Sequence, residues 1–340
     1  MVRFTVLASG SKGNSTVVTG GQTRILVDCG LSCRELFRRM KLAGEDPETL
    51  DAILITHEHA DHVGGVAVTA RKLGIPVYFT EATHRAWMRW LNPRKQMTYA
   101  QWLEQVRKQA AELQAEADAP LAEGEADDSD EVEDASAPIS TENAELAASQ
   151  SLPTMDQGPK NAKEPTVLKK DPTWLPGVEY FQAGRPFSIG DLAVSPFTTP
   201  HDAADPVGFV FQSEGVRMAY ATDLGYLPPN VKAQLKGVDL LLLESNHDLE
   251  MLRDGPYPWA VKQRVLSRVG HLSNEAAAAF LERDYDGQAA YVILAHLSES
   301  NNLPDLARVA AEHALAGHGS LLANRLLLAS QQEPLSSIYF

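Results

Sequence analysis

Short apolar stretches rich in β-branched residues follow one another through the N-terminal part of the chain, and glycine-containing turns separate them. Apolar stretches of this length between turns predict strands. The predicted strands cover residues 3–9, 15–19, 23–28, 50–55 and 75–80. Apolar residues at helical spacing predict helices over 32–44 and 63–74.

The second half of the chain repeats this pattern. Further strands are predicted over residues 178–184, 191–199, 206–212, 217–223 and 235–245. The C-terminal third has helical spacing over 258–269, 274–284 and 303–317, interrupted by a predicted strand at 289–296. Two strand-rich halves, each followed by helices, predict an α+β fold in which two β-sheets pack face to face with helices outside.

Residues 103–173 do not fit this pattern. No aromatic residue occurs between Trp102 and Trp174, and Ala, Glu, Asp, Ser and Pro dominate. Such a segment cannot bury enough apolar area to offset the entropy lost on ordering. We therefore predict a single domain over residues 1–340 with an acidic, largely disordered insert at 103–173. Disorder is expected from about Pro120 to Pro165.

The net charge of −15 argues at first against a nucleic-acid partner, which usually meets a basic surface. Between Glu112 and Glu145, however, thirteen acidic residues occur without any Lys or Arg. Removing those thirteen from −15 leaves −2 for all other residues. The charge therefore does not exclude a polyanionic substrate.

Two further features of the composition concern location. No apolar stretch approaches the roughly 18 residues that cross a bilayer, and the N-terminus breaks into Gly and Ser too early for a secretory signal. Cys29 and Cys33 are the only cysteines, so a disulfide framework is not expected. These features favour a cytoplasmic protein without a membrane partner.

The stretch ITHEHADHVGG follows a predicted buried strand and carries His57, His59, Asp61 and His62 within six positions. Imidazole suits zinc, manganese or iron, and a carboxylate favours a harder ion or holds a water. The alternative is a solvated polar loop. Three more ligand-type residues, His201, Asp223 and His296, stand at the ends of other predicted strands. One rim of a sheet would bring them together, so a metal site is favoured.

These residues resemble the metallo-β-lactamase superfamily, which implies a four-layer αβ/βα sandwich with the site on one rim. The phrases ASGSKGN, HDAADP, LESNHDLEML, YPWAVKQRVLSRVGHLSNE and LAHLSESNN are similar to the YycJ/WalJ-type nuclease branch. That resemblance implies a cytoplasmic 5′-to-3′ DNA exonuclease with a role in DNA repair. It also implies that Asp28, in LVDCG, supports the metal loop rather than binding metal.

The resemblance assigns the ligands of two divalent ions, zinc or manganese. His57, His59 and His201 would hold one ion, and Asp61, His62 and His296 the other, with Asp223 bridging. Members that cleave β-lactams usually have a cysteine or histidine in place of this bridging aspartate, which argues against antibiotic hydrolysis. Asp61 would orient the attacking water as a catalytic residue.

The motif GHLSNEAAAAFL resembles one in transfer-RNA 3′-processing nucleases, which makes His271 a candidate to stabilise the transition state or donate a proton. Ser273 and Asn274 begin the helix that follows. They could bind a phosphate there or simply cap the helix. Glu244 could orient a histidine, or could be an ordinary carboxylate at a strand end.

Two further segments could contact substrate. In GSKGNS, Ser11 and Asn14 stand in a predicted tight turn near the metal rim. In YPWAVKQRV, Lys262 and Arg264 accompany Tyr257 and Trp259. That combination fits a surface for phosphates and bases, and equally a solvated amphipathic helix.

Three function classes remain open at this stage. We favour metal-dependent hydrolysis of phosphodiesters in nucleic acid, with DNA more expected than RNA. The second class is a small-molecule hydrolase that cleaves a thioester or lactone at the same site. The third is a metal-binding regulatory protein without turnover. The sequence does not determine the native metal, the polarity of digestion or the oligomeric state, for which a dimer is one option.

Overall fold

The computed structural model of the protein describes residues 1–93, 103–104, 107–108, 171–317 and 325–340. Met1–Pro93 together with Lys170–Phe340 form one compact unit, and Arg94–Lys169 are assigned to a second. The stretch predicted to be disordered lies outside the described residues, so the insert at 103–173 within a single domain stays a prediction. None of the helices in the described ranges combines the length and apolar character of a membrane span.

The first sheet contains the N-terminal strands and has the order β14-β1-β2-β3-β4-β5-β6. Its strands are β1 (Arg3–Ala8), β2 (Ser15–Gly20), β3 (Thr23–Val27), β4 (Ala52–Leu54), β5 (Val77–Phe79), β6 (Val178–Tyr180) and β14 (Ile338–Tyr339). The pairs from β14 to β3 are antiparallel, and those from β3 to β6 are parallel. The carboxyl ends of β3 and β4 therefore lie at the same edge.

The second sheet has the order β13-β12-β11-β10-β9-β8-β7. Its strands are β7 (Phe187–Ile189), β8 (Leu192–Thr198), β9 (Val207–Ser213), β10 (Val216–Ala221), β11 (Leu240–Glu244), β12 (Tyr291–Ala295) and β13 (Arg325–Leu328). The pairs from β10 to β13 are parallel, while β9 is antiparallel to both β8 and β10. Strands β8, β10, β11 and β12 therefore all end at one edge of this sheet.

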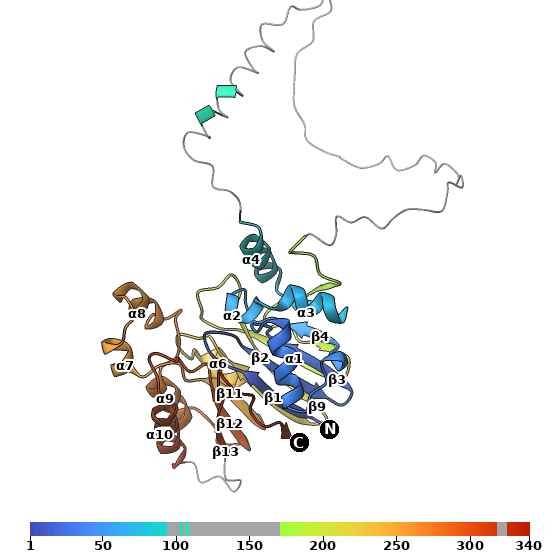
Figure 1. Ribbon diagram of the computed structural model, residues 1–340. Helices are drawn as coiled ribbons and strands as arrows, with labels where there is room; N and C mark the ends of the chain where they lie inside the picture. The colour runs from blue at the N-terminus through green and yellow to red at the C-terminus, as the bar shows by residue number, and fades with distance from the viewer. Residues whose placement is uncertain (94–102, 105–106, 109–170, 318–324) are drawn as a thin grey trace, which may run out of the picture. The chain divides into compact units, whose positions relative to one another are not determined.

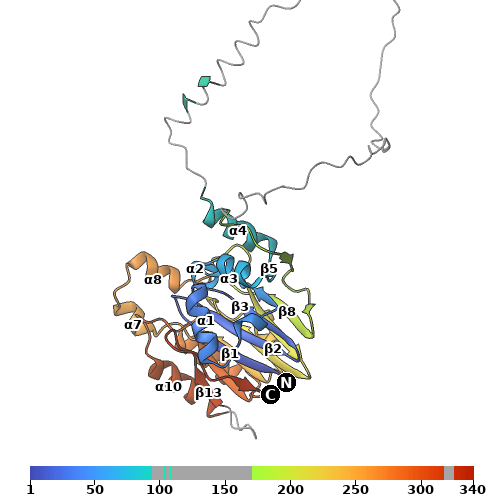
Figure 2. The same ribbon diagram turned by 45° about the vertical axis from the view of Figure 1, so that its right-hand side comes forward.

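Helices cover the outer face of each sheet, and the two inner faces pack together (Figures 1 and 2). Phe4 from the first sheet and Phe209 from the second belong to one buried apolar cluster between the sheets. A second cluster joins the first sheet to α1 (Cys33–Leu42), α3 (Val66–Leu73) and α4 (Glu81–Leu91). A third joins the other sheet to α6 (Pro229–Gln234), α9 (Asn274–Arg283) and α10 (Pro304–Leu315). The predicted α+β sandwich with helices outside is confirmed.

The structure differs from the predicted elements mainly in the edge strands of the sheets and in several helices. The sequence pattern did not predict β7, β13 and β14, which are at most four residues long and each form an edge strand of a sheet. It also missed α4, α6 and α7 (Leu249–Asp254). The helix predicted over 258–269 is α8, which spans only Trp259–Val265. After it the chain doubles back so tightly that a Cβ on Gly270 would lie 2.2 Å from the carbonyl oxygen of Val265.

The rim is also where the backbone leaves the regular strand conformation. Asp28, Asp223 and His296 have φ values of 58°, 58° and 57°. They follow β3, β10 and β12 within one or two positions. Non-glycine residues rarely adopt this left-handed conformation, and where they do the surrounding structure must hold them there. These polar side chains are therefore held in position by backbone geometry that costs free energy.

Candidate metal centre

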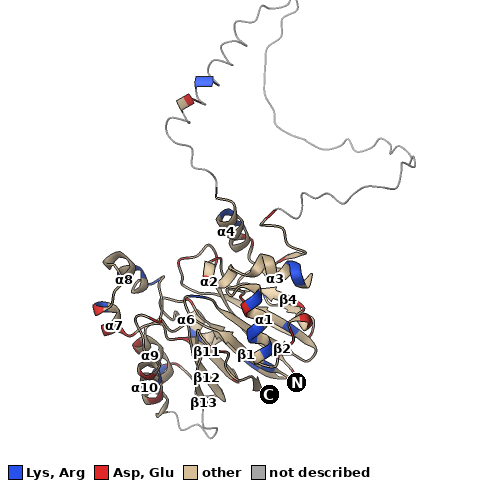
Figure 3. Ribbon diagram, in the orientation of Figure 1, with Lys and Arg blue, Asp and Glu red and all other residues tan. Residues whose placement is uncertain are grey.

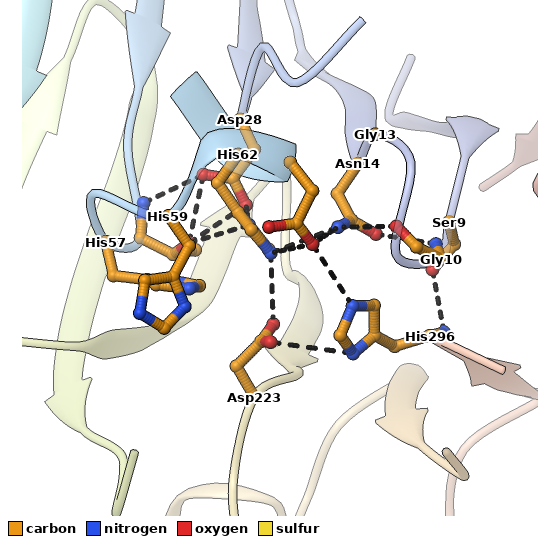
Figure 4. A network of polar contacts seen from close by, with 12 residues as sticks. Ser9, Gly10, Gly13, Asn14, Asp28, His57, His59, His62, Asp223 and His296 are labelled. Atoms are coloured by element: carbon orange, nitrogen blue, oxygen red, sulfur yellow. Dashed lines mark hydrogen bonds and ion pairs between the residues drawn. The ribbon is translucent and has the colours of Figure 1, made fainter. Parts of the chain in front are cut away.

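The seven predicted ligands converge at one rim of the sandwich. His57, His59, Asp61 and His62 come from the loop after β4 and from the short helix α2 (Ala60–Val63). His201, Asp223 and His296 come from the ends of β8, β10 and β12. Figure 4 shows Asp223 facing His62, which comes from the first sheet, and His296, which comes like Asp223 itself from the second sheet.

One ligand set consists of His57, His59 and His201, each of which offers an atom within 4.8 Å of the others. The His59 Nδ1 atom lies 3.2 Å from the His201 Nε2 atom. The His57 Nε2 atom is buried and has no hydrogen-bond partner among the described residues. Three imidazole nitrogens facing one point form a donor set typical of zinc and similar ions.

A second set, Asp61, His62 and His296, meets the same 4.8 Å limit. The Asp61 Oδ2 atom lies 3.4 Å from His62 Nε2 and 3.5 Å from His296 Nε2. This set combines a carboxylate with two imidazoles, which also suits a divalent transition metal.

Asp223 lies between the two sets. Its Oδ2 atom is 3.4 Å from His62 Nε2, and its Oδ1 atom is 3.7 Å from His201 Nε2. The carboxylate therefore reaches one histidine of each set with a different oxygen. This placement is compatible with the predicted bridging role of Asp223, which stays a prediction.

Three of the histidines are oriented through their other ring nitrogen. His62 Nδ1 is 2.8 Å from Asp28 Oδ2, and His296 Nδ1 is 2.9 Å from Glu244 Oε1. His201 Nδ1 is 3.0 Å from the carbonyl oxygen of Gly270. Acceptors at Nδ1 keep the proton there and leave the Nε2 lone pair facing the centre of the site, an arrangement typical of metal-binding histidines.

The two supporting carboxylates, Asp28 and Glu244, are fully buried. Asp28 also accepts hydrogen bonds from the backbone N–H and the hydroxyl of Thr56 at 2.9 and 3.0 Å. Glu244 accepts bonds from two imidazoles through Oε1 and from two backbone N–H groups through Oε2. Both oxygens of Glu244 are thus occupied, which favours its predicted role in support over direct metal binding.

The charges of the carboxylates and histidines at the rim are compatible with bound cations. Burial alone would lower the pKa of His62, but Asp223, Asp61 and Asp28 raise it well above its usual value. Burial would likewise raise the pKa of Asp61, yet His62 and His296 hold it low. The Oδ2 atom of Asp223 and the Nε2 atom of His296 are buried without a hydrogen-bond partner among the described residues. Unpaired buried acceptors are costly, and divalent cations would satisfy them.

A pocket of about 310 Å³ opens onto these residues and is lined by His59, Asp61, Asp223 and His296. Of the other predicted site residues, Ser11, Arg264 and His271 line it. His271 is partly exposed, and its Nδ1 atom lies 2.8 Å from Glu244 Oε1. The catalytic role predicted for His271 stays a prediction, but its side chain stands beside the ligands.

The remaining predicted substrate contacts do not line this pocket. Asn14 is buried, and its Nδ2 atom lies 3.1 Å from Asp61 Oδ2 and 3.0 Å from His62 Nε2. Ser273 caps α9 by accepting a bond from the backbone N–H of Ala276 at 3.1 Å. Asn274 is buried and bonded to neighbouring side chains, and Lys262 Nζ donates to the carbonyl oxygen of Arg253 at 2.6 Å. In this structure the polar groups of these four side chains bond to other parts of the protein.

Sequence reasoning missed several side chains that line the pocket. Asp202 forms an ion pair with Arg264, and its Oδ1 atom lies 3.5 Å from His201 Nε2. Asn246 donates to the carbonyl oxygen of His296 at 2.8 Å. Asn301 presents a buried Oδ1 atom without a partner among the described residues. All three stand within motif phrases, in HDAADP, LESNH and SESNN, and proximity to His201, Glu244 and His296 was the available signal.

Comparison with known proteins decides the family. A model of the metallo-β-lactamase superfamily matches residues 8–261, most of the chain. The chain belongs to this superfamily. The exodeoxyribonuclease YycJ of Bacillus anthracis is 30% identical over 320 residues, which cover 94% of this chain and 90% of that protein. The exodeoxyribonuclease WalJ of Streptococcus pneumoniae is 30% identical over 314 residues, or 92% and 88% of the two chains.

Solved structures agree on the fold. The metallo-β-lactamase fold protein YhfI from Bacillus subtilis superimposes with a TM-score of 0.57 at 16% identity, and the match covers 98% of both chains. The predicted relationship to YycJ/WalJ-type proteins is confirmed by the long matches to the two exodeoxyribonucleases. Together with the superfamily match, these relatives identify the chain as a metal-dependent hydrolase.

Proposed function

We propose that this hydrolase is a nuclease that cleaves phosphodiester bonds in DNA from the 5′ end, using two divalent ions, zinc or manganese. The observation that carries the proposal is the pair of facing ligand sets on either side of Asp223, open to a pocket that also contains His271 and Arg264. Both long relatives are named exodeoxyribonucleases, which supports DNA as the substrate. A role in DNA repair and a cytoplasmic location are further predictions from the same resemblance.

The proposed chemistry assigns a task to each residue. When bound, the ions supply a nucleophile near neutral pH and neutralise charge on the phosphate. Asp61 accepts a hydrogen bond from Asn14 at 3.1 Å, which holds its carboxylate in place to orient the attacking water. His271 is held through Nδ1 by Glu244, and its side chain lines the pocket. In this position it donates a hydrogen bond to the phosphate or a proton to the leaving oxygen.

Substrate recognition is proposed to come from the rim around the pocket. Arg264 lines it and can neutralise a phosphate, with Asp202 holding the guanidinium in place. Ser11, in the loop between β1 and β2, also lines the pocket. Lys262, Ser273 and Asn274 act indirectly in this proposal, because their polar groups already bind other parts of the chain.

A direct assay tests this function. Purified protein loaded with zinc or manganese is incubated with end-labelled DNA and RNA, each single-stranded and double-stranded. We expect mononucleotides to be released from the 5′ end of DNA, and expect His59→Ala and Asp61→Ala to abolish this release and to lower metal content. His313→Ala, an exposed histidine on α10, is the matched control and should behave as wild type. Hydrolysis of thioesters or lactones without cleavage of any nucleic acid would refute the proposal.

A further inference from the structure

One wall of the metal pocket contains no metal ligand. Val261, Arg264 and Val265 line the pocket, and their spacing places them on one face of α8. Tyr257, in the segment that leads into this helix, lines the same pocket. Figure 3 shows basic residues on α8, and Arg264 brings one of them to this wall. The wall therefore combines an aromatic residue, two valines and a cation in the same pocket as the ligands.

The side chain of Tyr257 is free to contact a ligand. Apart from the histidines, it is the one aromatic residue among the described residues that line the pocket. Its ring has no aromatic partner, and its hydroxyl has no hydrogen bond, within the described part of the chain. The residue is also partly exposed. Such a ring can stack on any nucleic-acid base, because every base presents a flat π-face.

The segment that carries Tyr257 has little conformational freedom. Pro256 and Pro258 flank it, and a proline fixes its own φ and restricts the residue before it. Gly255 packs so closely on the side chain of Asn301 that a Cβ at this position would lie 2.4 Å from the Asn301 Oδ1 atom. A ring held on such a segment loses little conformational entropy when a ligand binds to it.

Buried polar side chains line the pocket next to this segment. Asn246, Ser298 and Asn301 all line it and are almost inaccessible to solvent. The Ser298 N–H donates to the Asn246 carbonyl oxygen at 2.8 Å, and the Asn301 N–H donates to the Ser298 hydroxyl at 3.2 Å. The Asn301 Oδ1 atom, which lies beside Gly255, has no hydrogen-bond partner among the described residues. An acceptor left unpaired in a buried site costs free energy, and a ligand with N–H or O–H groups, such as a nucleoside, can supply the missing donor.

We propose that this wall binds the nucleoside of the terminal nucleotide, with its base stacked on Tyr257 and its phosphate between Arg264 and the metal centre. The inference rests on the proposed function and deepens it, because it assigns which part of the pocket holds which part of the substrate. The pocket volume of about 310 Å³ is at the small end of the range for ligand sites, which suits one nucleotide rather than a duplex.

The test measures binding of dAMP and of 2-deoxyribose 5-phosphate, which lacks the base, to zinc-loaded protein by isothermal titration calorimetry. We expect wild type to bind dAMP roughly 5- to 100-fold more tightly, the gain typical of stacking one base on an aromatic side chain. Tyr257→Ala should lose this difference and keep its affinity for the sugar phosphate, while Tyr257→Phe should retain the difference. Trp259→Ala is the matched control and should behave as wild type, because Trp259 is 65% exposed on the same helix and does not line the pocket.

The cleavage assay on end-labelled DNA and RNA, run on the same preparations, separates this inference from the proposed function. No preference of wild type for dAMP, or an undiminished preference in Tyr257→Ala, would overturn the subsite even if wild type cuts DNA. A loss of the preference in Trp259→Ala as large as in Tyr257→Ala would also overturn it. If the preference depends on Tyr257 but no nucleic acid is cut, the nucleotide subsite stands and the nuclease function is refuted.

Discussion

Replacing Glu244 by Gln should weaken metal binding although Glu244 is not assigned as a ligand. Its Oε1 atom accepts from the Nδ1 atoms of His271 and His296 at 2.8 and 2.9 Å. Its Oε2 atom accepts from the backbone N–H groups of Leu224 and Leu272 at 2.9 and 3.3 Å. Glutamine has nearly the same shape but offers one acceptor oxygen and one donor group, so two of these four donors must face an N–H.

Both orientations of the glutamine amide are unfavourable. If its NH2 group faces the imidazoles, His296 must accept at Nδ1 and carry its proton on Nε2, the atom that faces Asp61. That nitrogen can then no longer bind metal. If the NH2 group faces the backbone, two buried N–H groups lose their acceptor at about 1–3 kcal/mol each. Loss of such an outer carboxylate typically lowers metal affinity about 10- to 100-fold.

The assay is competition for zinc against a chromophoric chelator, with the unfolding midpoint of the metal-free protein measured alongside. Glu45→Gln is the matched control, because Glu45 is also buried and accepts a bond from the Thr5 hydroxyl at 2.8 Å, away from the ligands. We expect both variants to lose stability and only Glu244→Gln to lose zinc affinity. Zinc affinity equal to wild type in Glu244→Gln would refute the reasoning about ring orientation.

Three further outcomes follow from buried groups elsewhere in the fold. Trp87→Ala, which removes a 1% exposed side chain on the buried face of α4, should lower the free energy of unfolding by about 3–5 kcal/mol; a denaturant midpoint close to wild type would contradict this. Ser273→Ala removes the cap of α9 and should cost about 1 kcal/mol, measured in the same way, and a larger loss of activity than of stability would show that the hydroxyl also contacts substrate. Burial raises the pKa of the Cys29 thiol from 9.0 to about 12, so native protein should resist iodoacetamide at pH 8. The pKa of Cys29 is higher in the folded than in the unfolded protein, so folding favours the neutral thiol. The resulting contribution of Cys29 to the free energy of unfolding is present below pH 9 and is lost as pH rises toward 12. A Cys29→Ala variant that loses as much stability over this pH range as wild type would contradict this.

The sandwich could be predicted from sequence because its strands are short apolar runs bounded by turns. Each of the strands β1 to β6 and β8 to β12 lies within a predicted stretch or extends beyond it by one residue. The elements that were missed, such as β13 and β14, are short and lie at sheet edges, and their strand conformation depends on pairing with distant parts of the chain. β14, for example, pairs with β1 from the opposite end of the sequence. Local periodicity does not contain that information.

The candidate ligands could also be read from the sequence. His57, His201 and Asp223 are polar residues two or three positions after buried strands, and strands running in the same direction end at one edge of a sheet. Residue type and position relative to a strand therefore predicted which side chains meet at the rim. The family resemblance added how they divide between two ions, and this division remains to be tested.

Only the tertiary structure decided what surrounds those ligands. The sequence left Asn14, Ser273 and Asn274 open as substrate contacts, and the fold buries all three. It also pairs Asp202 with Arg264 across 62 positions of the chain and places Glu244 between His271 and His296. The reason is physical: residue type sets which bonds a side chain can make, whereas packing of distant segments sets which partners lie within hydrogen-bonding distance and whether solvent can reach them.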